Sequence, residues 1–119
     1  MYFSGHGLKG SGDWKACGQE TVSLTDVFEA LKSALPSDFW IKIYIDCCYS
    51  GEWCHTAKEK FDSNKMPVSH FMNIQIKTSS DRHTKSEWAK WREANFCGRE
   101  NKDYARKYGV TFWRSGESV

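Results

Sequence analysis

The stretch that decides the fold is Trp40-Ile41-Lys42-Ile43-Tyr44-Ile45-Asp46-Cys47-Cys48-Tyr49-Ser50-Gly51. It opens with an apolar run typical of a β-strand, and then come an acid, two thiols and a turn of small residues. A second short apolar run far upstream, Tyr2-Phe3-Ser4-Gly5-His6-Gly7, ends in a histidine between two glycines. If the two strands lie side by side in a parallel sheet, a thiol and an imidazole become neighbours, as a cysteine nucleophile and its base are.

The segment between these runs predicts a helix that connects them. Ser23 can cap its start, and Asp26 occupies the capping-box position three residues later. Apolar residues recur at three- and four-residue steps, at Val27, Phe28, Leu31, Ala34 and Leu35. Pro36 ends the helix. A strand, a covering helix and a second strand make a βαβ crossover, which implies parallel strands and a right-handed connection.

Three further segments follow the thiols. Ser50-Gly51 allows a tight turn into a helix over about residues 52–61, whose N-terminus favours a thiolate nearby. Residues 71–78 alternate, with Met72, Ile74 and Ile76 on one face, which predicts a half-buried strand nearer the edge of the sheet. The loop 79–83 lies at the carboxyl end of that strand, where open parallel sheets bind ligands, so we expect it near the other two strand ends.

The remaining segments are less regular. Residues 8–22 predict a Gly-rich loop. Thr84-Lys85-Ser86-Glu87 is a capping box for a helix to about Phe96, with Trp88 and Trp91 on one side. Residues 110–113 predict a short strand, and residues 114–119 a frayed tail.

Length and composition limit the classes of protein. A chain of 119 residues and 13.8 kDa forms one small domain, and 39% hydrophobic residues supply a core. A net charge of +2 gives no argument for nucleic acid or a membrane surface. Five cysteines without a repeated spacing fit neither a disulfide framework nor a zinc site, so we expect a reducing, cytoplasmic setting. No apolar run approaches the ~18 residues of a membrane span.

The two strand ends resemble a known pair of motifs. Ser4-Gly5-His6-Gly7 and Asp46-Cys47-Cys48-Tyr49-Ser50-Gly51 are similar to the catalytic motifs of the caspase-like cysteine peptidases, closer in form to metacaspases, paracaspases and CHAT peptidases than to true caspases. With the order of elements between them, the resemblance extends over roughly the first ninety positions. It implies an α/β fold of the caspase–hemoglobinase type, a three-layer α-β-α sandwich with a mainly parallel sheet.

On this interpretation residues 1–119 are a single caspase-like peptidase domain. Nothing before Met1 supplies the first strand and helix of such a domain, so we expect an N-terminally truncated, incomplete one.

The resemblance assigns catalytic roles to two residues. Matching Asp46 to the start of the motif and Ser50-Gly51 to its end makes Cys48 the nucleophile, with His6 as the base and later the proton donor. Alternation along a strand points Cys47 and Cys48 to opposite faces, so only one of them can meet His6. The family further implies an oxyanion hole formed by the backbone N–H groups of Gly7 and Cys48. No cofactor is expected.

Substrate preference is also inferred from the resemblance. In metacaspase-like enzymes the acid of the Asp-x-Cys motif and a second acid after the next strand line the pocket for a basic side chain. Asp46 matches the first acid and Asp81 is the candidate for the second, and two carboxylates together favour Arg or Lys. Asp81 could equally be a solvated loop acid or a helix-entry residue, and Arg82 could neutralise the pocket.

The sequence therefore predicts a cysteine endopeptidase that cleaves after Arg or Lys. Two alternatives stay open: a catalytically inactive pseudo-peptidase or truncated interaction module of the same fold, and a redox or acyl-transfer enzyme with the same dyad. The expected partners are a peptide or protein substrate and either the missing N-terminal segment or a second copy of the chain, without nucleic acid or membrane. We expect no metal site, because Cys54-His55 lacks a second ligand pair and no acidic cluster suits calcium.

Overall fold

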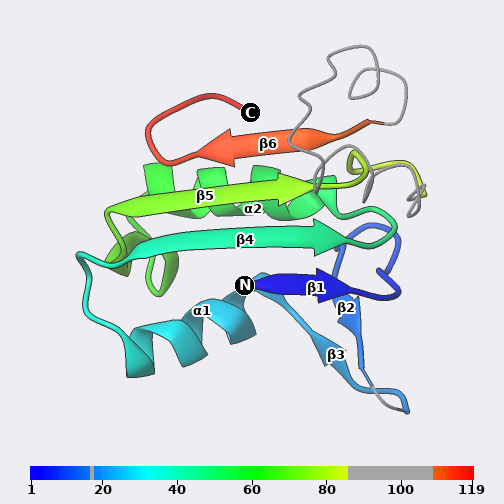
Figure 1. Ribbon diagram of the computed structural model, residues 1–119, viewed down its shortest axis with the longest axis horizontal. Coiled ribbons are helices and arrows are strands. Elements are labelled where there is room, and N and C mark those ends of the chain that lie inside the picture. Colours follow the sequence, from blue (N-terminus) through cyan, green and yellow to red (C-terminus); the bar gives the residue numbers. More distant parts are fainter. Residues whose placement is uncertain (17, 86–108) are drawn as a thin grey trace.

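The computed structural model describes residues 1–16, 18–85 and 109–119. These residues form a small, compact α/β domain with a mixed four-stranded sheet in the order β1-β4-β5-β6 (Figure 1). Strands β1, β4 and β5 run parallel, and β6 runs antiparallel to β5. The strands are β1 (Tyr2–Ser4), β4 (Trp40–Asp46), β5 (Asn73–Thr78) and β6 (Thr111–Arg114).

The central strand β4 spans the predicted residues, and its parallel pairing with β1 confirms the parallel crossover. The next strand differs from its prediction in two ways. It begins at Asn73 rather than at 71, because the 3₁₀ turn η1 (Val68–His70) ends at Phe71. It also lies inside the sheet, between β4 and β6, because the last strand folds back against it.

Helix α1 (Leu24–Ala34) forms where the sequence predicts it. The Ser23 hydroxyl accepts a hydrogen bond from the Asp26 N–H at 3.1 Å, and the Asp26 carboxylate accepts one from the Ser23 N–H at 2.9 Å. This is the complete capping box, which satisfies backbone donors at the start of the helix. The helix buries Leu24, Val27 and Phe28, and Leu35 is already extended before Pro36.

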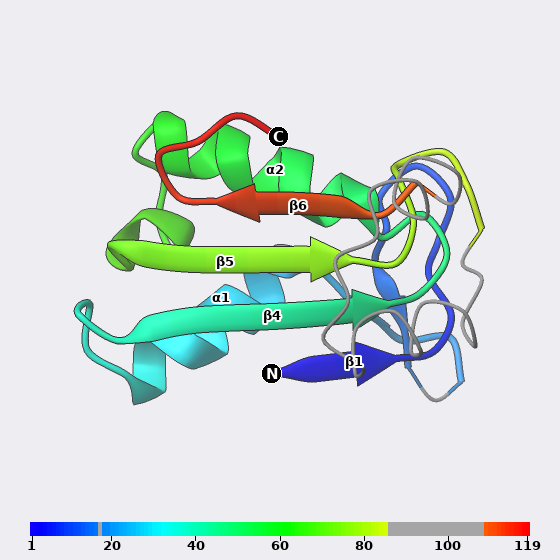
Figure 2. The same ribbon diagram turned by 45° about the horizontal axis from the view of Figure 1, so that its top comes forward.

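Helix α2 (Gly51–Asp62) follows the thiols and lies with α1 on the same face of the sheet (Figures 1 and 2). The strands bury a shared apolar set against these helices: Ile41, Ile43, Ile45, Ile74, Ile76 and Trp113. The opposite face carries exposed aromatic side chains, including Trp40, Tyr44 and Phe112. The described part of the chain therefore shows two of the three predicted layers, the sheet and the helices on one face. The predicted helix over 84–96, with Trp88 and Trp91, lies almost wholly outside the described residues.

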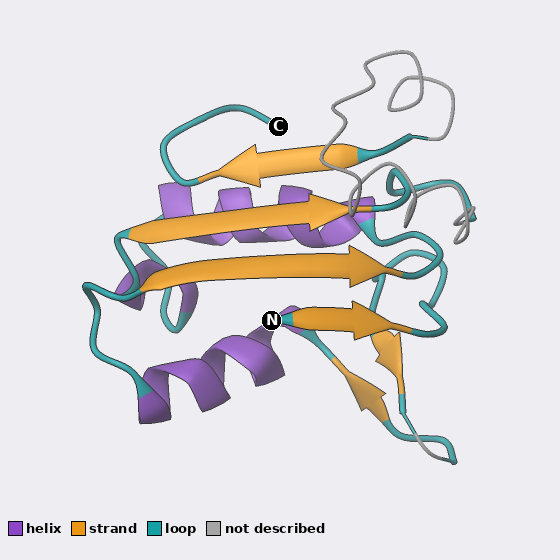
Figure 3. Ribbon diagram, viewed as in Figure 1, coloured by secondary structure: helices purple, strands orange, loops and turns teal. Residues whose placement is uncertain are grey.

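The Gly-rich loop contains a small hairpin that the sequence pattern does not reveal. Strands β2 (Trp14–Lys15) and β3 (Thr21–Val22) pair antiparallel beside the main sheet (Figure 3). The hairpin is fixed by stacking, because the Trp14 ring lies 4.1 Å from that of Phe3 and 4.4 Å from that of Trp53. Two-residue strands have no periodicity to detect, so this hairpin depends on tertiary contacts.

The C-terminal residues differ from the predicted frayed tail. Arg114 belongs to β6, the Ser115 N–H donates to the Ile74 carbonyl at 2.9 Å, and the Trp113 indole N–H donates to the Glu117 carbonyl at 3.1 Å. Among the described segments, no helix has both the length and the apolar character needed to cross a membrane.

Candidate active site

The ends of β1 and β4 bring His6 and Cys48 to one edge of the sheet. Ser4 and Asp46 are the last paired residues of β1 and β4, and the Gly5 N–H donates to the Asp46 carbonyl at 3.2 Å. The segments that follow β1 and β4 lie at the carboxyl edge of the sheet (Figures 1 and 2). His6 follows the end of β1 by two residues, and Cys48 follows the end of β4 by two residues. The His6 side chain is exposed and the Cys48 side chain is half-buried.

The two loops are pressed together at Gly7. A methyl group built on Gly7 would lie 2.1 Å from the Cys48 carbonyl oxygen and 2.8 Å from the Cys47 sulfur. No side chain fits in that space, so glycine is the residue that permits this approach. The segment that carries His6 is therefore in direct contact with the segment that carries both thiols.

Two backbone donors at this contact are not used by the sheet. In a parallel ladder the rungs after the Gly5–Asp46 bond would use the N–H groups of Cys48 and Gly7. Within the described residues, neither of these N–H groups donates a hydrogen bond to another group. They are the two donors that the resemblance assigns to an oxyanion hole.

The neighbouring thiols differ in their surroundings. Cys47 is fully buried, and burial raises the pKa of its thiol to about 12, with further contributions from Cys48 and the charge of Asp46. Cys48 is half-buried. A thiol nucleophile must be accessible and able to ionise, so Cys48 is the better candidate of the pair.

A third loop joins this edge, as the sequence predicts. The Tyr49 N–H donates to the Thr84 carbonyl at 2.8 Å, and the Ser80 hydroxyl donates to the Cys47 carbonyl at 3.0 Å. A methyl group built on Gly51 would lie 2.6 Å from the Asp81 backbone. The loop after β5 is therefore packed against the turn that carries Cys48.

The two candidate specificity acids differ in accessibility. Asp46 is fully buried, whereas Asp81 is half-buried. One Asp81 oxygen accepts the His83 N–H at 2.7 Å, which is the local bond of a loop acid. This bond is consistent with the structural alternative for Asp81. Gly109 packs against the second carboxylate oxygen, since a methyl group built on Gly109 would lie 2.9 Å from it.

Arg82 does not direct its charge at Asp81. Its guanidinium makes two hydrogen bonds to the Glu52 carboxylate, at 2.7 and 2.9 Å, across to the first turn of α2. The hydrogen bonds to Glu52 raise the pKa of Arg82 further. Sequence reasoning left open whether Arg82 neutralises the acidic pocket, and this long-range pair with Glu52 could not be read from the sequence.

The adjacent Cys54 and His55 lie away from this edge, on α2. Cys54 is fully buried, its thiol lies 3.6 Å from the Ile76 carbonyl, and burial raises its pKa to about 12. The pKa of His55 is lowered, first by burial and then by the charge of Arg82. Across the described ranges, no group of three His, Cys, Asp or Glu side chains is placed to hold a metal ion.

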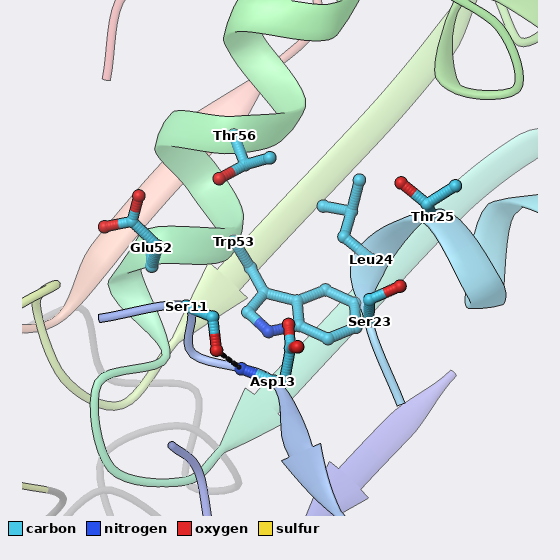
Figure 4. Close-up of a pocket in the computed structure, with 8 residues that line it drawn as sticks. All are labelled: Ser11, Asp13, Ser23, Leu24, Thr25, Glu52, Trp53 and Thr56. Carbon is cyan, nitrogen blue, oxygen red and sulfur yellow. Dashed lines mark hydrogen bonds between the residues drawn. The ribbon is translucent and has the colours of Figure 1, made fainter. Parts of the chain in front are cut away.

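A separate pocket of about 170 Å³ lies where the Gly-rich loop, the start of α1 and the first turns of α2 meet (Figure 4). It is lined by Ser11, Asp13, Ser23, Leu24, Thr25, Glu52, Trp53 and Thr56. Burial raises the pKa of Asp13, and the Ser11 hydroxyl accepts the Asp13 N–H at 3.2 Å. Neither His6 nor a thiol lines this pocket, so it is distinct from the candidate active site.

Comparison with family models, with curated proteins and with solved structures finds no match to this chain.

Proposed function

We propose that this protein is a cysteine endopeptidase of the caspase-like type that uses Cys48 and His6. The observation that carries the proposal is the contact of Gly7 with the Cys48 backbone. That contact places the loop that carries His6 against the turn that carries the half-buried Cys48 thiol. The Gly7 and Cys48 N–H groups lie at the same contact. A nucleophile, a base and oxyanion donors at one edge are the parts that acyl transfer requires.

The proposed reaction proceeds in two halves. His6 takes the thiol proton of Cys48, and the Cys48 sulfur attacks the scissile carbonyl carbon. The carbonyl oxygen, now negative, is stabilised by the Gly7 and Cys48 N–H groups. His6 donates a proton to the leaving amine as the C–N bond breaks, which leaves a thioester on Cys48. Water, deprotonated by His6, then attacks the thioester carbon. The C–S bond breaks, the acid product leaves, and His6 returns the proton to the Cys48 sulfur.

The proposed substrate is a peptide with Arg or Lys before the scissile bond. Asp81 is the more accessible of the two candidate acids, so we assign it the main contact with the basic side chain and Asp46 a supporting electrostatic role. The Glu52 pair supports this assignment, because it holds Arg82, the next residue along the chain, in another interaction. Three free thiols among the described cysteines also support a reducing, cytoplasmic setting.

The test is turnover of peptides that end in Arg, Lys or Asp by the wild type, Cys48→Ala and Cys47→Ala. We expect Cys48→Ala to lose at least about 1000-fold in kcat/KM, since a nucleophile cannot be replaced. Cys47→Ala is the matched control, because it removes the adjacent buried thiol, and it should retain most activity. Activity that survives in Cys48→Ala would reject the nucleophile, and a preference for Asp would reject the acidic pocket.

The exposed aromatic sheet face favours a second candidate, a non-catalytic interaction module. Trp40 is 60% exposed and Tyr44 is 37% exposed, on a face that α/β proteins usually cover. The two candidates differ at Cys48. A peptidyl chloromethyl ketone ending in Arg should alkylate Cys48 of a peptidase at a rate that saturates with probe concentration, whereas an interaction module should react only as slowly as a small thiol.

A further inference from the structure

A buried serine at the end of β5 contacts the turn that carries Cys48. Ser80 is fully buried, and its hydroxyl donates to the Cys47 carbonyl at 3.0 Å. Its oxygen accepts the Ser50 N–H at 3.1 Å, and the two serine hydroxyls lie 3.0 Å apart. Ser50 is fully buried as well. Ser80 therefore ties the loop after β5 to two points of the turn that carries Cys48, the Cys47 carbonyl and Ser50.

The direction of each hydrogen bond in this cluster can be assigned. A hydroxyl has one proton to donate, and the Ser80 proton goes to the Cys47 carbonyl. The proton between the two hydroxyls must therefore come from Ser50, which also receives the Ser80 N–H at 3.4 Å. Every donor of the cluster then has a partner, which is the condition under which buried polar groups hold one geometry.

The bond to the Cys47 carbonyl also determines where the Cys48 N–H points. The Cys47 carbonyl and the Cys48 N–H belong to one planar trans peptide, so they point in opposite directions. When Ser80 holds the carbonyl on one side, the N–H is held on the other. A rotated peptide would lose the Ser80 bond inside the protein, where no water can replace it.

We propose that Ser80, supported by Ser50, is a positioning residue that orients the Cys48 N–H as an oxyanion donor. This inference rests on the proposed peptidase function and deepens it. Ser80 acts through the Cys47–Cys48 peptide and does not touch the substrate. Its removal should therefore weaken stabilisation of the oxyanion more than binding of the substrate or the intrinsic reactivity of the thiol.

The experiment compares Ser80→Ala with Ser69→Ala in three assays. Ser69 is the matched control, because its buried hydroxyl has no hydrogen-bond partner among the described residues. For Ser80→Ala we expect kcat to fall by about 10- to 100-fold and KM to change by less than about threefold. This loss in kcat is smaller than the loss expected when an oxyanion-hole donor is itself removed. A peptide aldehyde ending in Arg adds to the Cys48 sulfur through its carbonyl carbon and places its oxygen at the oxyanion position. Its affinity should fall by a similar factor.

Alkylation of Cys48 by iodoacetamide forms no oxyanion, so Ser80→Ala should react within about twofold of the wild type. An equal loss in turnover, aldehyde affinity and alkylation would show general damage to the turn and overturn the inference. Unchanged turnover would overturn it as well.

Ser80→Thr, which keeps the hydroxyl, should recover turnover, and Ser50→Ala provides a second variant if Ser80→Ala does not fold. A wild type that neither cleaves peptides nor binds the aldehyde would reject the proposed function and this role with it.

Discussion

The two ends of the sheet are built from different kinds of side chain. At the amino end of β4 and β5 the buried side chains are apolar, among them Ile41, Val68, Phe71 and Ile74. The buried polar side chains of the described residues gather at the carboxyl end: Asp46, Ser50, Thr78, Ser79 and Ser80. One sheet therefore has an apolar core at one end and a hydrogen-bonded polar cluster at the other.

The two ends of the sheet contribute differently to the stability of the domain and to the geometry of the candidate site. Apolar burial is non-directional and contributes most of the folding free energy, but it does little to fix the direction of a peptide group. The hydrogen bonds of the buried serines contribute less net free energy, yet they restrict the backbone to one arrangement. We infer that the apolar end holds the domain together, whereas the polar end holds the nucleophile turn in place.

The largest effect on stability is expected from Phe71→Ala at the apolar end. Phe71 is fully buried and its ring makes an edge contact with Phe28, so truncation leaves a cavity. We expect a loss of about 3–5 kcal/mol in the free energy of unfolding, measured by urea titration. The rate of Cys48 alkylation per folded molecule should stay close to that of the wild type. A variant with normal stability but an altered Cys48 rate would contradict the division between the two ends.

A comparable effect, seen in turnover, is expected from Gly7→Ala at the polar end. The new methyl group would lie 2.1 Å from the Cys48 carbonyl oxygen, so the two loops must separate. We expect turnover to fall by at least about 100-fold, equivalent to about 2.7 kcal/mol. Gly10→Ala is the control, because nothing lies within 4 Å of its methyl position, although a φ of +93° makes that change cost some stability. Equal losses of turnover in both variants would indicate that the contact at Gly7 has no special role.

A smaller effect is expected at high pH. The folded pKa of Cys54, about 12, exceeds its reference value of 9.0, so the folded state keeps a proton that the unfolded state releases. Its contribution to stability is complete below pH 9 and is lost as the pH rises towards 12, by at most about 1.4 kcal/mol per pH unit. Cys54→Ala should therefore show a shallower decline of unfolding free energy between pH 9 and 11. An unchanged slope would mean that this thiol is not protected by burial.

The sequence was sufficient for the elements that local rules determine. The capping box of Ser23 and Asp26 and the apolar period of α1 are contained within a dozen residues, and the run 40–46 carries its own strand pattern. Three-residue β1 could be placed because the crossover constrains it.

Other features depend on partners that are distant in the chain. The bonds of Ser80 to Cys47 and Ser50, and of Arg82 to Glu52, join residues about thirty positions apart, and serine or arginine has no periodic signature there. The hairpin of Trp14 depends on stacking with Phe3 and Trp53. The sequence could therefore nominate His6 and Cys48, but it could not reveal the hydrogen bonds that support them.

The most direct test of a Cys48–His6 peptidase site is the crystal structure of the protein with a peptide aldehyde ending in Arg. We predict a covalent bond from the Cys48 sulfur to the aldehyde carbon, with the new oxygen within hydrogen-bond distance of the Gly7 and Cys48 N–H groups. The His6 ring should face the leaving-group side, and the Arg side chain should contact Asp81. An aldehyde bound to another thiol, or His6 too far from Cys48 for one carbonyl group to lie between them, would contradict the proposed site.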